Sequence, residues 1–281
     1  MSQDIQLAGF SYTRFPSAEV RDTRLNQELE VNEYNFFLNL PTRLKNEKTV
    51  LINGLQYRLV TPFVDNDLNL GLDEQKLHLI GYRFTMVHQL SDSWRAVVSL
   101  NPIVSSTFNV ALEGSDFLLN GTMHFMKKKS DRLSYGGGIA LTARFGEPTL
   151  IPTLQLNYKT EKGRFQVLLP SHITYDRFFE RFTAGLLVAV NGSLYNVNSS
   201  RTNLFNEIEL VDKLAYSRVV LGPAMSYRVG KFLRLEASGG ITIARRVEHQ
   251  SDLLEDQNYD IANGPFFRLG IAIVPPNKDD N

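Results

Sequence analysis

The chain has 281 residues, of which 30 are basic and 30 acidic, so its formal net charge is zero and gives no reason to expect a nucleic-acid partner. The absence of cysteine excludes disulfides, thiol catalysis and thiolate metal sites. No apolar run approaches the roughly 20 residues that a membrane-spanning helix needs.

Apolar and polar residues alternate in segments along the whole chain, and this period of two predicts β-strands. In residues 135–145, for example, the odd positions are apolar or glycine, with an aromatic residue at each end, and the even positions are small, polar or charged. Thirteen such segments follow in chain order: 5–15, 31–40, 51–59, 80–86, 94–101, 117–125, 135–145, 150–158, 165–175, 182–190, 217–229, 232–244 and 266–274. No linker or low-complexity tract interrupts them, so we expect one domain over residues 1–281.

The polar faces of these segments bear on whether the sheet is soluble or lies in a membrane. A soluble sheet would carry many lysines and glutamates on its water-facing side, whereas these faces carry small polar residues and single arginines. Such faces are typical of the wet interior of a membrane barrel, and aromatic residues at the ends of the apolar faces are typical of its interfacial girdles. We therefore expect an all-β fold, a closed antiparallel transmembrane β-barrel. A soluble all-β domain is the alternative.

The number of strands stays open between two values, because thirteen is odd and single-chain bacterial barrels have an even count. The ambiguous stretch is LPSHITYDRFFERF, residues 169–182, where Pro170 interrupts any ladder because proline lacks a backbone donor. This stretch is compatible with one strand, two short strands or a loop. We expect twelve strands, with fourteen as the alternative.

The connections between segments fall into two sizes. Some are tight, such as 90–94 and 159–163, and others are long and acidic, such as 61–75, 196–213 and 245–264. Membrane barrels have short periplasmic turns and longer extracellular loops. We therefore expect the tight connections to face the periplasm and the acidic loops to face outward.

Three features resemble the small outer-membrane barrel proteins that are abundant in Bacteroidota. These are the hairpins SYRVGKFLRLEASGGI and LSDSWRAVVSL and the final segment FFRLGIAIV. The resemblance covers most of the chain as a pattern but includes no diagnostic motif, and the chain departs from many such barrels by running on through PPNKDDN. It implies the outer membrane of a Gram-negative bacterium, contact with outer-membrane lipid and lipopolysaccharide, and other envelope proteins as partners.

The sequence indicates no catalytic or metal-binding residues. A membrane hydrolase needs a serine with a histidine base, but Ser171 and His172 are adjacent on an expected strand and therefore point to opposite faces. Residues 65–74 have the alternating acidic positions of a calcium loop, yet Leu70 and Lys76 stand where that loop needs glycine and glutamate. We expect no enzyme activity, no cofactor and no metal.

Charged residues on the polar faces are the candidate functional set. We expect the following to line the lumen: Arg58, Arg83, Arg95, Arg144, Arg218, Arg228, Arg234, Glu236 and Arg268. The inward acids are few, chiefly Glu33 and Glu236. Either the lumen is a cationic passage that favours anionic solutes, or the acidic loops fold in, pair with the arginines and plug the barrel.

Bulky residues expected to point inward favour the filled barrel, namely Phe37, Leu118, Leu187, Phe232 and Phe266. We therefore expect a non-enzymatic outer-membrane barrel that acts as an accessory or scaffold subunit of a larger assembly. The alternative is a porin-like passive or selective pore for small anions through an arginine-lined lumen.

Overall fold

The computed structural model describes residues 6–21, 27–65, 75–109, 111–143, 147–202, 208–251 and 256–276. Its strands are β1 Ala8–Glu19, β2 Glu28–Arg43, β3 Thr49–Asp65, β4 Leu77–Gln89, β5 Trp94–Ser106, β6 Phe117–Lys128, β7 Leu133–Thr142, β8 Thr149–Lys159, β9 Gly163–Leu169, β10 His172–Phe178, β11 Phe182–Thr202, β12 Ile208–Val229, β13 Leu233–Gln250, β14 Gln257–Ile261 and β15 Gly264–Ile273. The helical content of these residues is one 3-10 turn, η1, at Gly114–Asp116. Within the same residues, no helix has the length and apolar character needed to cross a membrane.

The strands form a closed antiparallel barrel. Each strand from β1 to β13 pairs with the next one along the chain, and β15 closes the ring by pairing with both β13 and β1. Strand β14 pairs with the end of β13 at residues 245–249. Of the fifteen strands, all but β14 therefore form the ring, which has fourteen strands with β14 as an extra strand outside it.

The expected count of twelve strands is wrong, and the alternative of fourteen is confirmed. Residues 165–175, which the alternation predicts as one segment, account for the step from the thirteen segments to fourteen strands in the ring. The chain turns at residues 170–171 and forms two strands of seven residues each, β9 and β10. Pro170 stands in this turn, where its missing backbone donor interrupts no ladder.

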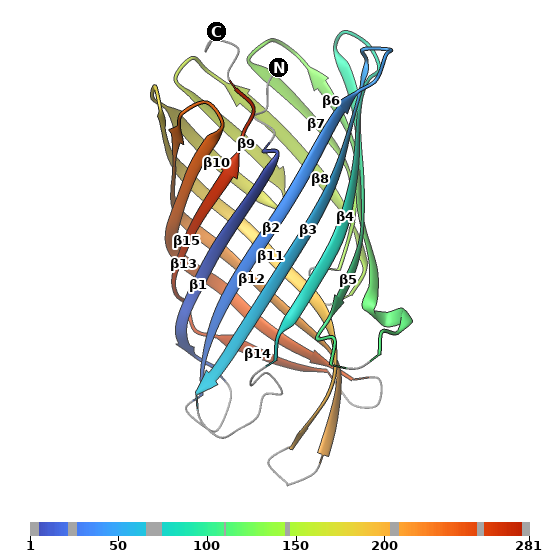
Figure 1. Cartoon of the computed structure of the whole chain (residues 1–281), viewed down its shortest axis with the longest axis vertical. Helices are drawn as coiled ribbons and strands as arrows, with labels where there is room; N and C mark the ends of the chain where they lie inside the picture. The colour runs from blue at the N-terminus through green and yellow to red at the C-terminus, as the bar shows by residue number, and fades with distance from the viewer. Residues whose placement is uncertain are drawn as a thin grey trace.

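The two ends of the barrel differ in their connections (Figure 1). At one end, where β1 begins and β15 ends, short turns join the strands at 44–48, 90–93, 129–132, 160–162, 179–181 and 230–232. We call this the turn end and the opposite one the loop end. Most connections at the loop end are longer, but the link between β9 and β10 has only residues 170–171.

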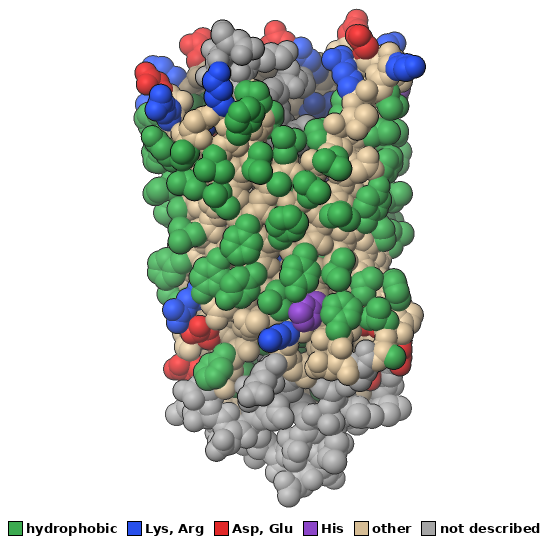
Figure 2. Space-filling view, in the orientation of Figure 1, with side chains coloured by type: hydrophobic (Ala, Val, Ile, Leu, Met, Phe, Trp, Pro, Cys, Tyr) green, Lys and Arg blue, Asp and Glu red, His purple; other side chains and the backbone are tan. Residues whose placement is uncertain are grey.

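Large apolar side chains are exposed around the outside of the barrel. Figure 2 shows them as a band, with charged residues gathered above and below it. Twelve strands each contribute one of the following: Phe10, Phe36, Leu55, Ile80, Leu100, Leu119, Ile139, Leu154, Leu186, Met225, Ile241 and Leu269. Soluble monomers rarely expose an apolar patch above roughly 300–600 Å². This belt is therefore the lipid-facing surface of a transmembrane barrel.

Prolines within the strands fall where a strand has a ladder partner on one side only. Six prolines have a paired residue on only one neighbouring strand: Pro41, Pro62, Pro102, Pro152, Pro223 and Pro265. Proline cannot donate a hydrogen bond to a second neighbour, so these positions mark local breaks in the wall. The break at Pro152, on β8, borders the end of the short β9–β10 hairpin.

Candidate functional site

The interior of the barrel is apolar at the loop end. Inward-facing side chains from many strands form one buried cluster there, which we call the plug: Phe15, Ala18, Val20, Leu29, Val31, Val60, Val64, Leu77, Leu79, Ile103, Tyr195, Val197, Val211, Leu214, Tyr216, Val220, Val247, Ile261 and Phe266. A ring of fourteen strands is wider than the roughly eight-stranded barrels whose interiors side chains alone can fill. Additional backbone inside the ring is therefore needed to close it.

The loop-end half of β11 contributes to the closure: its pairing with β10 ends at Ala189, but it stays paired with β12 as far as Thr202. Asn196 of β11 pairs in parallel with Ser106 of β5, although β6 to β10 lie between these two strands in the ring. The Ser105 hydroxyl also donates to the Leu194 carbonyl oxygen at 2.6 Å. A wall strand that has lost one of its two neighbours and contacts β5 therefore forms the described part of the closure, whereas half of the acidic loop residues expected to fold in lie outside the described residues.

The β9–β10 hairpin is short, and it ends where β11 loses its partner on that side. The β8–β9 ladder begins at Leu154, so residues 149–153 of β8 pair with β7 alone. On the other side, Val190 of β11 donates its backbone N–H to the Ser171 carbonyl oxygen at 2.8 Å, beside the tip of the hairpin.

The length of the hairpin can be compared with the apolar belt. Seven residues of about 3.3 Å, tilted by about 35–45°, reach roughly 16–19 Å along the barrel axis, which is less than the approximately 25 Å height of the apolar band of a membrane barrel. The wall therefore has an interruption of its strand pairing between β8 and β11 on the loop side of the belt, where buried side chains such as Ala143 and Leu194 pack together. We call it the wall gap.

The turn-end half of the lumen is polar, and we call it the vestibule. Arg83 donates to the Gln56 side-chain oxygen at 2.8 Å, and the hydroxyls of Thr85 and Ser99 lie 2.9 Å apart on neighbouring strands. These inward residues alternate with the exposed apolar residues of the belt. The vestibule can therefore hold water and polar groups, whereas the plug is mainly apolar and encloses a few buried charged side chains, Glu33, Arg218 and Arg245.

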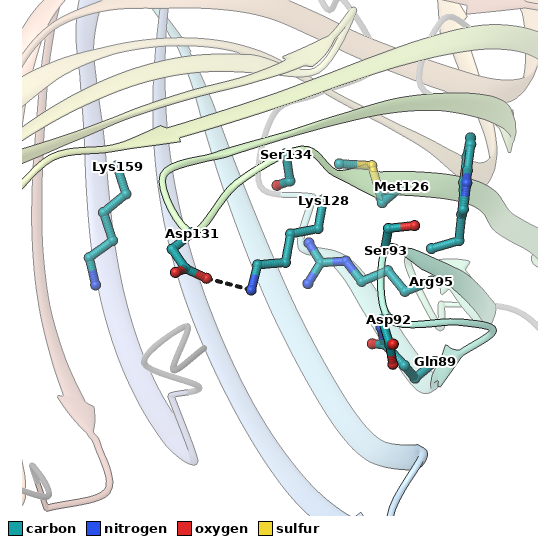
Figure 3. Close-up of a pocket in the computed structure, with 10 residues that line it drawn as sticks. Gln89, Asp92, Ser93, Arg95, Met126, Lys128, Asp131, Ser134 and Lys159 are labelled. Carbon is teal, nitrogen blue, oxygen red and sulfur yellow. Dashed lines mark ion pairs between the residues drawn. The ribbon is translucent and has the colours of Figure 1, made fainter.

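A cavity of about 440 Å³ lies at the rim of the vestibule, between the β4–β5 and β6–β7 turns (Figure 3). Arg95 and Lys159 contribute positive charge, and Asp92 and Asp131 contribute negative charge. The Lys128 ammonium lies 2.5 Å from Asp131, and its hydrogen bond lowers the pKa of that carboxyl group. Because both signs of charge are present, this rim does not by itself select anions.

The expected lumen arginines form separate small networks. Glu236 accepts hydrogen bonds from Gln6 at 2.5 Å and Arg234 at 3.0 Å, and Arg268 lies 4.0 Å from its other carboxylate oxygen. Arg218 is buried and lies 2.5 Å from Glu33. Charge in the vestibule is therefore partly neutralised within the wall.

The other expected residues are spread over both halves of the lumen. Arg58 is half-buried and donates to the Ser193 hydroxyl at 2.9 Å, next to the plug. Arg83 and Arg95 lie in the vestibule, and Arg228 lies near the β12–β13 turn, where it donates to the Lys231 carbonyl oxygen at 3.4 Å. Arg144 lies outside the described residues.

The bulky residues expected to point inward divide into two groups. Phe266 belongs to the plug, Leu118 packs against it, and the Phe37 ring lies beside Gly9 on the inner face. Phe232 was expected inward, but it is 58% exposed because it lies in the turn before β13 rather than in the strand.

Two charged features are not found by alternation alone. Arg164 on β9 and Asp176 on β10 form an ion pair of 2.8 Å, which is invisible when residues 165–175 are taken as one strand. Arg245 is 1% exposed, whereas its neighbour Arg246 faces outward and pairs with Asp260 at 2.9 Å. The preceding Ala244 has a φ of 50°, and the inward phase of β13 shifts there from even to odd residues. A single sequence does not reveal such a bulge.

The described residues contain no group of three histidine, aspartate or glutamate side chains placed to hold a metal ion. The calcium-like stretch 65–74 lies, apart from Asp65, outside the part of the chain that the structure describes. The chemistry that the described interior offers is therefore hydrogen bonding, ion pairing and apolar contact.

One protein-family model matches residues 5–273, and its description is "Domain of unknown function (DUF6268)". No curated protein sequence matches the chain. Among solved structures, the Pseudomonas putida toluene transporter TodX is similar with a TM-score of 0.41 and 10% identity, over 98% of this chain and 90% of that chain. A TodX deltaS2 mutant, a monoaromatic hydrocarbon channel, is similar with a TM-score of 0.44 and 9% identity, over 96% of this chain and 89% of that chain. A Pseudomonas aeruginosa FadL homologue is similar with a TM-score of 0.34 and 12% identity, over 95% of this chain and 74% of that chain.

Proposed function

The chain belongs to the DUF6268 family, and we propose that it is a gated transport barrel of the bacterial outer membrane. The plug separates the vestibule from the loop end. Opening moves the loop-end half of β11 away from β5, and a solute then passes between the vestibule and the lipid beside the wall gap. The observation that carries the proposal is that β11 loses its partner on one side where the β9–β10 hairpin ends, stays paired with β12, and there contacts β5, so that one strand borders both the plug and the gap.

The location rests on the exterior of the barrel. A closed ring with an even number of strands, an apolar belt, short turns at one end and longer loops at the other has the form of single-chain barrels of bacterial outer membranes. In that membrane the vestibule faces the periplasm, because it lies at the turn end.

The plug is attached to β5 weakly enough to act as a gate. The β11–β5 contact has one paired position, Asn196 with Ser106, supported by the Thr107 backbone N–H donating to the Asn196 carbonyl oxygen at 3.2 Å. A hydrogen bond contributes a net of about 0.5–1.5 kcal/mol, so this attachment is far weaker than the ladder that holds β11 to β12 from Phe182 to Thr202. The loop-end halves of β11 and β12 therefore move together when the gate opens. The apolar contacts of Tyr195 and Val197 hold the gate closed until another apolar group replaces them.

The position of the gap limits the kind of solute. A molecule that leaves the lumen there meets acyl chains, so part of it must be apolar. A molecule that enters through the vestibule must also tolerate polar surroundings. Together these two environments favour an amphipathic solute.

The filled loop end also favours a second function, an accessory or scaffold subunit whose plug never opens. This function predicts no solute flux and stable association with other envelope proteins under mild detergent. An open anion pore would instead need a continuous lumen, and the plug interrupts it.

A disulfide across the gate tests the proposal, and the natural chain has no cysteine to interfere. Ser106→Cys with Asn196→Cys joins directly paired residues, and neighbouring strands lie about 4.8 Å apart, within the range that a disulfide spans. The matched control is Thr85→Cys with Ser99→Cys, a paired position in the β4–β5 ladder of the wall. Flux of the amphipathic dye pyrenebutanoate is measured in proteoliposomes, with protein-free vesicles as the baseline.

We expect oxidation to stop flux through the gate pair and reduction to restore it, with the control pair conducting in both states. Equal flux through the oxidised and reduced gate pair would refute gating by β11. Absence of flux in every form, together with co-purifying envelope proteins, would favour the scaffold. A steady ionic current through the oxidised gate pair in planar bilayers would favour the open pore.

A further inference from the structure

Arg245 is buried at the loop end, and no described residue pairs with its charge. Its side chain is 1% exposed, and none of its three guanidinium nitrogens has a hydrogen-bond partner among the described residues. The Nε atom of Arg218 and the hydroxyls of Tyr195 and Tyr216 likewise have none in that part of the chain. Arginine is almost never fully buried unless it is paired.

Arg218 and Arg245 are neighbours on adjacent strands. The β12–β13 register runs from Ser217 opposite Arg246 to Val219 opposite Ile243, so Arg218 lies opposite residues 244–245 at a bulge. Both guanidinium carbons lie over the ring of Phe15, at 4.4 Å for Arg218 and 5.8 Å for Arg245. Both side chains therefore reach the same place inside the plug.

The cluster has more donors than acceptors. Glu33 is the carboxylate that pairs with Arg218, and no described acid pairs with Arg245. A buried guanidinium without an anion is strongly unfavourable, so the site needs one further acceptor group with a negative charge. Two guanidinium forks are well suited to binding a carboxylate or a phosphate, because their planar donors match two oxygens of the anion.

We propose that Arg218 and Arg245 bind the oxyanion group, carboxylate or phosphate, of the transported solute. The proposal rests on the proposed transport function for the route by which a solute reaches the site. Phe15, Phe266 and Val247 surround the arginines with apolar surface, which suits the apolar part of such a solute.

The backbone supports a dedicated role for Arg245. Ala244 holds a φ of 50°, which a residue with a Cβ rarely adopts, and this bulge turns Arg245 rather than Arg246 inward. Other charged side chains also lie close to the gate. Glu33 pairs with Arg218, and Arg58 donates to the Ser193 hydroxyl on the β11 segment of the gate.

Binding is measured on detergent-solubilised protein by thermal unfolding, followed through the fluorescence of the single tryptophan, Trp94. The probes are sodium butyrate and inorganic phosphate, added at constant ionic strength with chloride as the balancing anion. An anion that binds the folded state raises the unfolding midpoint with the logarithm of its concentration. We expect one of the two probes to give this shift in the natural protein.

Arg245→Gln is expected to abolish the shift, and Arg246→Gln, which changes the adjacent outward arginine, is expected to keep it. Without probe, Arg245→Gln should unfold at the same or a higher temperature, because it removes an uncompensated charge. Tyr216→Phe, which removes one hydroxyl and changes no charge, should weaken the apparent affinity for the bound probe several-fold. It tests the site without altering the charge of the plug.

A butyrate shift assigns the site to carboxylates and a phosphate shift assigns it to phosphates. No shift with either probe, or an equal shift in Arg245→Gln and Arg246→Gln, would overturn the site. The binding assay uses protein in detergent and does not depend on transport. If the natural protein shows dye flux but no shift of the unfolding midpoint with either probe, the anion site alone is overturned. Loss of flux with the shift intact overturns the transport function alone.

Discussion

Replacing Glu33 by glutamine is expected to destabilise the barrel by about 3–5 kcal/mol, the usual effect of breaking a buried ion pair. The Glu33 and Arg218 side chains are 10% and 5% exposed, and their charged atoms lie 2.5 Å apart. Glutamine has nearly the same shape, so the change removes charge without creating a cavity. It leaves Arg218 and Arg245 as neighbouring buried cations without a described carboxylate between them.

The matched control is Glu30→Gln, which lies on the same strand but faces outward. Glu30 pairs with Arg14 at 3.0 Å, with side chains that are 20% and 52% exposed. Exposed pairs contribute about 0–1 kcal/mol, so the control should lose at most that amount. Urea unfolding followed by Trp94 fluorescence gives both free energies of unfolding.

The double variant Glu33→Gln with Arg218→Gln should recover much of the loss, because removing both partners of a buried pair is often nearly neutral. If Glu33→Gln and Glu30→Gln lose the same free energy, Glu33 and Arg218 are solvated and the plug is not the dry core described above. If the double variant is less stable than Glu33→Gln alone, the loss does not come from an unpaired cation.

Three further predictions concern the wall and the gate. Gly138→Ala should destabilise the barrel by roughly 1–3 kcal/mol, as overpacking does, because the new Cβ would lie 1.8 Å from a β6 carbonyl oxygen. In the control Gly137→Ala the Cβ would lie 3.1 Å from its nearest atom, so the free energy of unfolding should change little. Equal effects of the two changes would contradict the close approach at Gly138. Leu154→Arg, on the lipid face, should destabilise the barrel by about 2–4 kcal/mol if it lies near the middle of the bilayer. Gln155→Arg, on the inward face, should be tolerated in the same urea assay. A larger loss of stability in Gln155→Arg than in Leu154→Arg would show that the two faces are assigned the wrong way round. Tyr195→Ala should lower stability by about 3–5 kcal/mol, as truncation of a buried aromatic does. It should also raise dye flux above that of the natural protein and add a steady ionic current that the natural plug prevents; unchanged flux and current would show that the gate lies elsewhere.

The barrel can be predicted from the sequence because the alternation of apolar and polar residues has a direct physical cause. Lipid on one side and an enclosed polar space on the other require different residues on the two faces of a strand. The strand count was harder to predict because a two-residue turn inside an alternating segment keeps the same pattern of residue types. Only Pro170 signals the turn between β9 and β10, and one proline is compatible with a turn, an edge or a bulge.

The interior was predicted less completely, for two reasons. Alternation shows that Glu236 and Arg268 share a face but does not show that they lie 4.0 Å apart on neighbouring strands. It also fails wherever a bulge shifts the phase, which hid Arg245. Bulky inward residues predict a filled lumen, but the contact between β11 and β5 is a tertiary feature that no local pattern encodes.

The departures from ordinary barrel construction gather at the loop end of neighbouring strands. A hairpin too short for the belt, a strand that loses one of its two neighbours, a non-glycine residue at positive φ and an arginine without a counter-charge among the described residues all occur between β9 and β13. Each of them lowers stability, and a barrel that only had to remain closed would need none of them. Sequences usually break the rules of folding where function requires it. The concentration of these features around β11 therefore favours a moving gate with a buried anion site over a permanent structural filling.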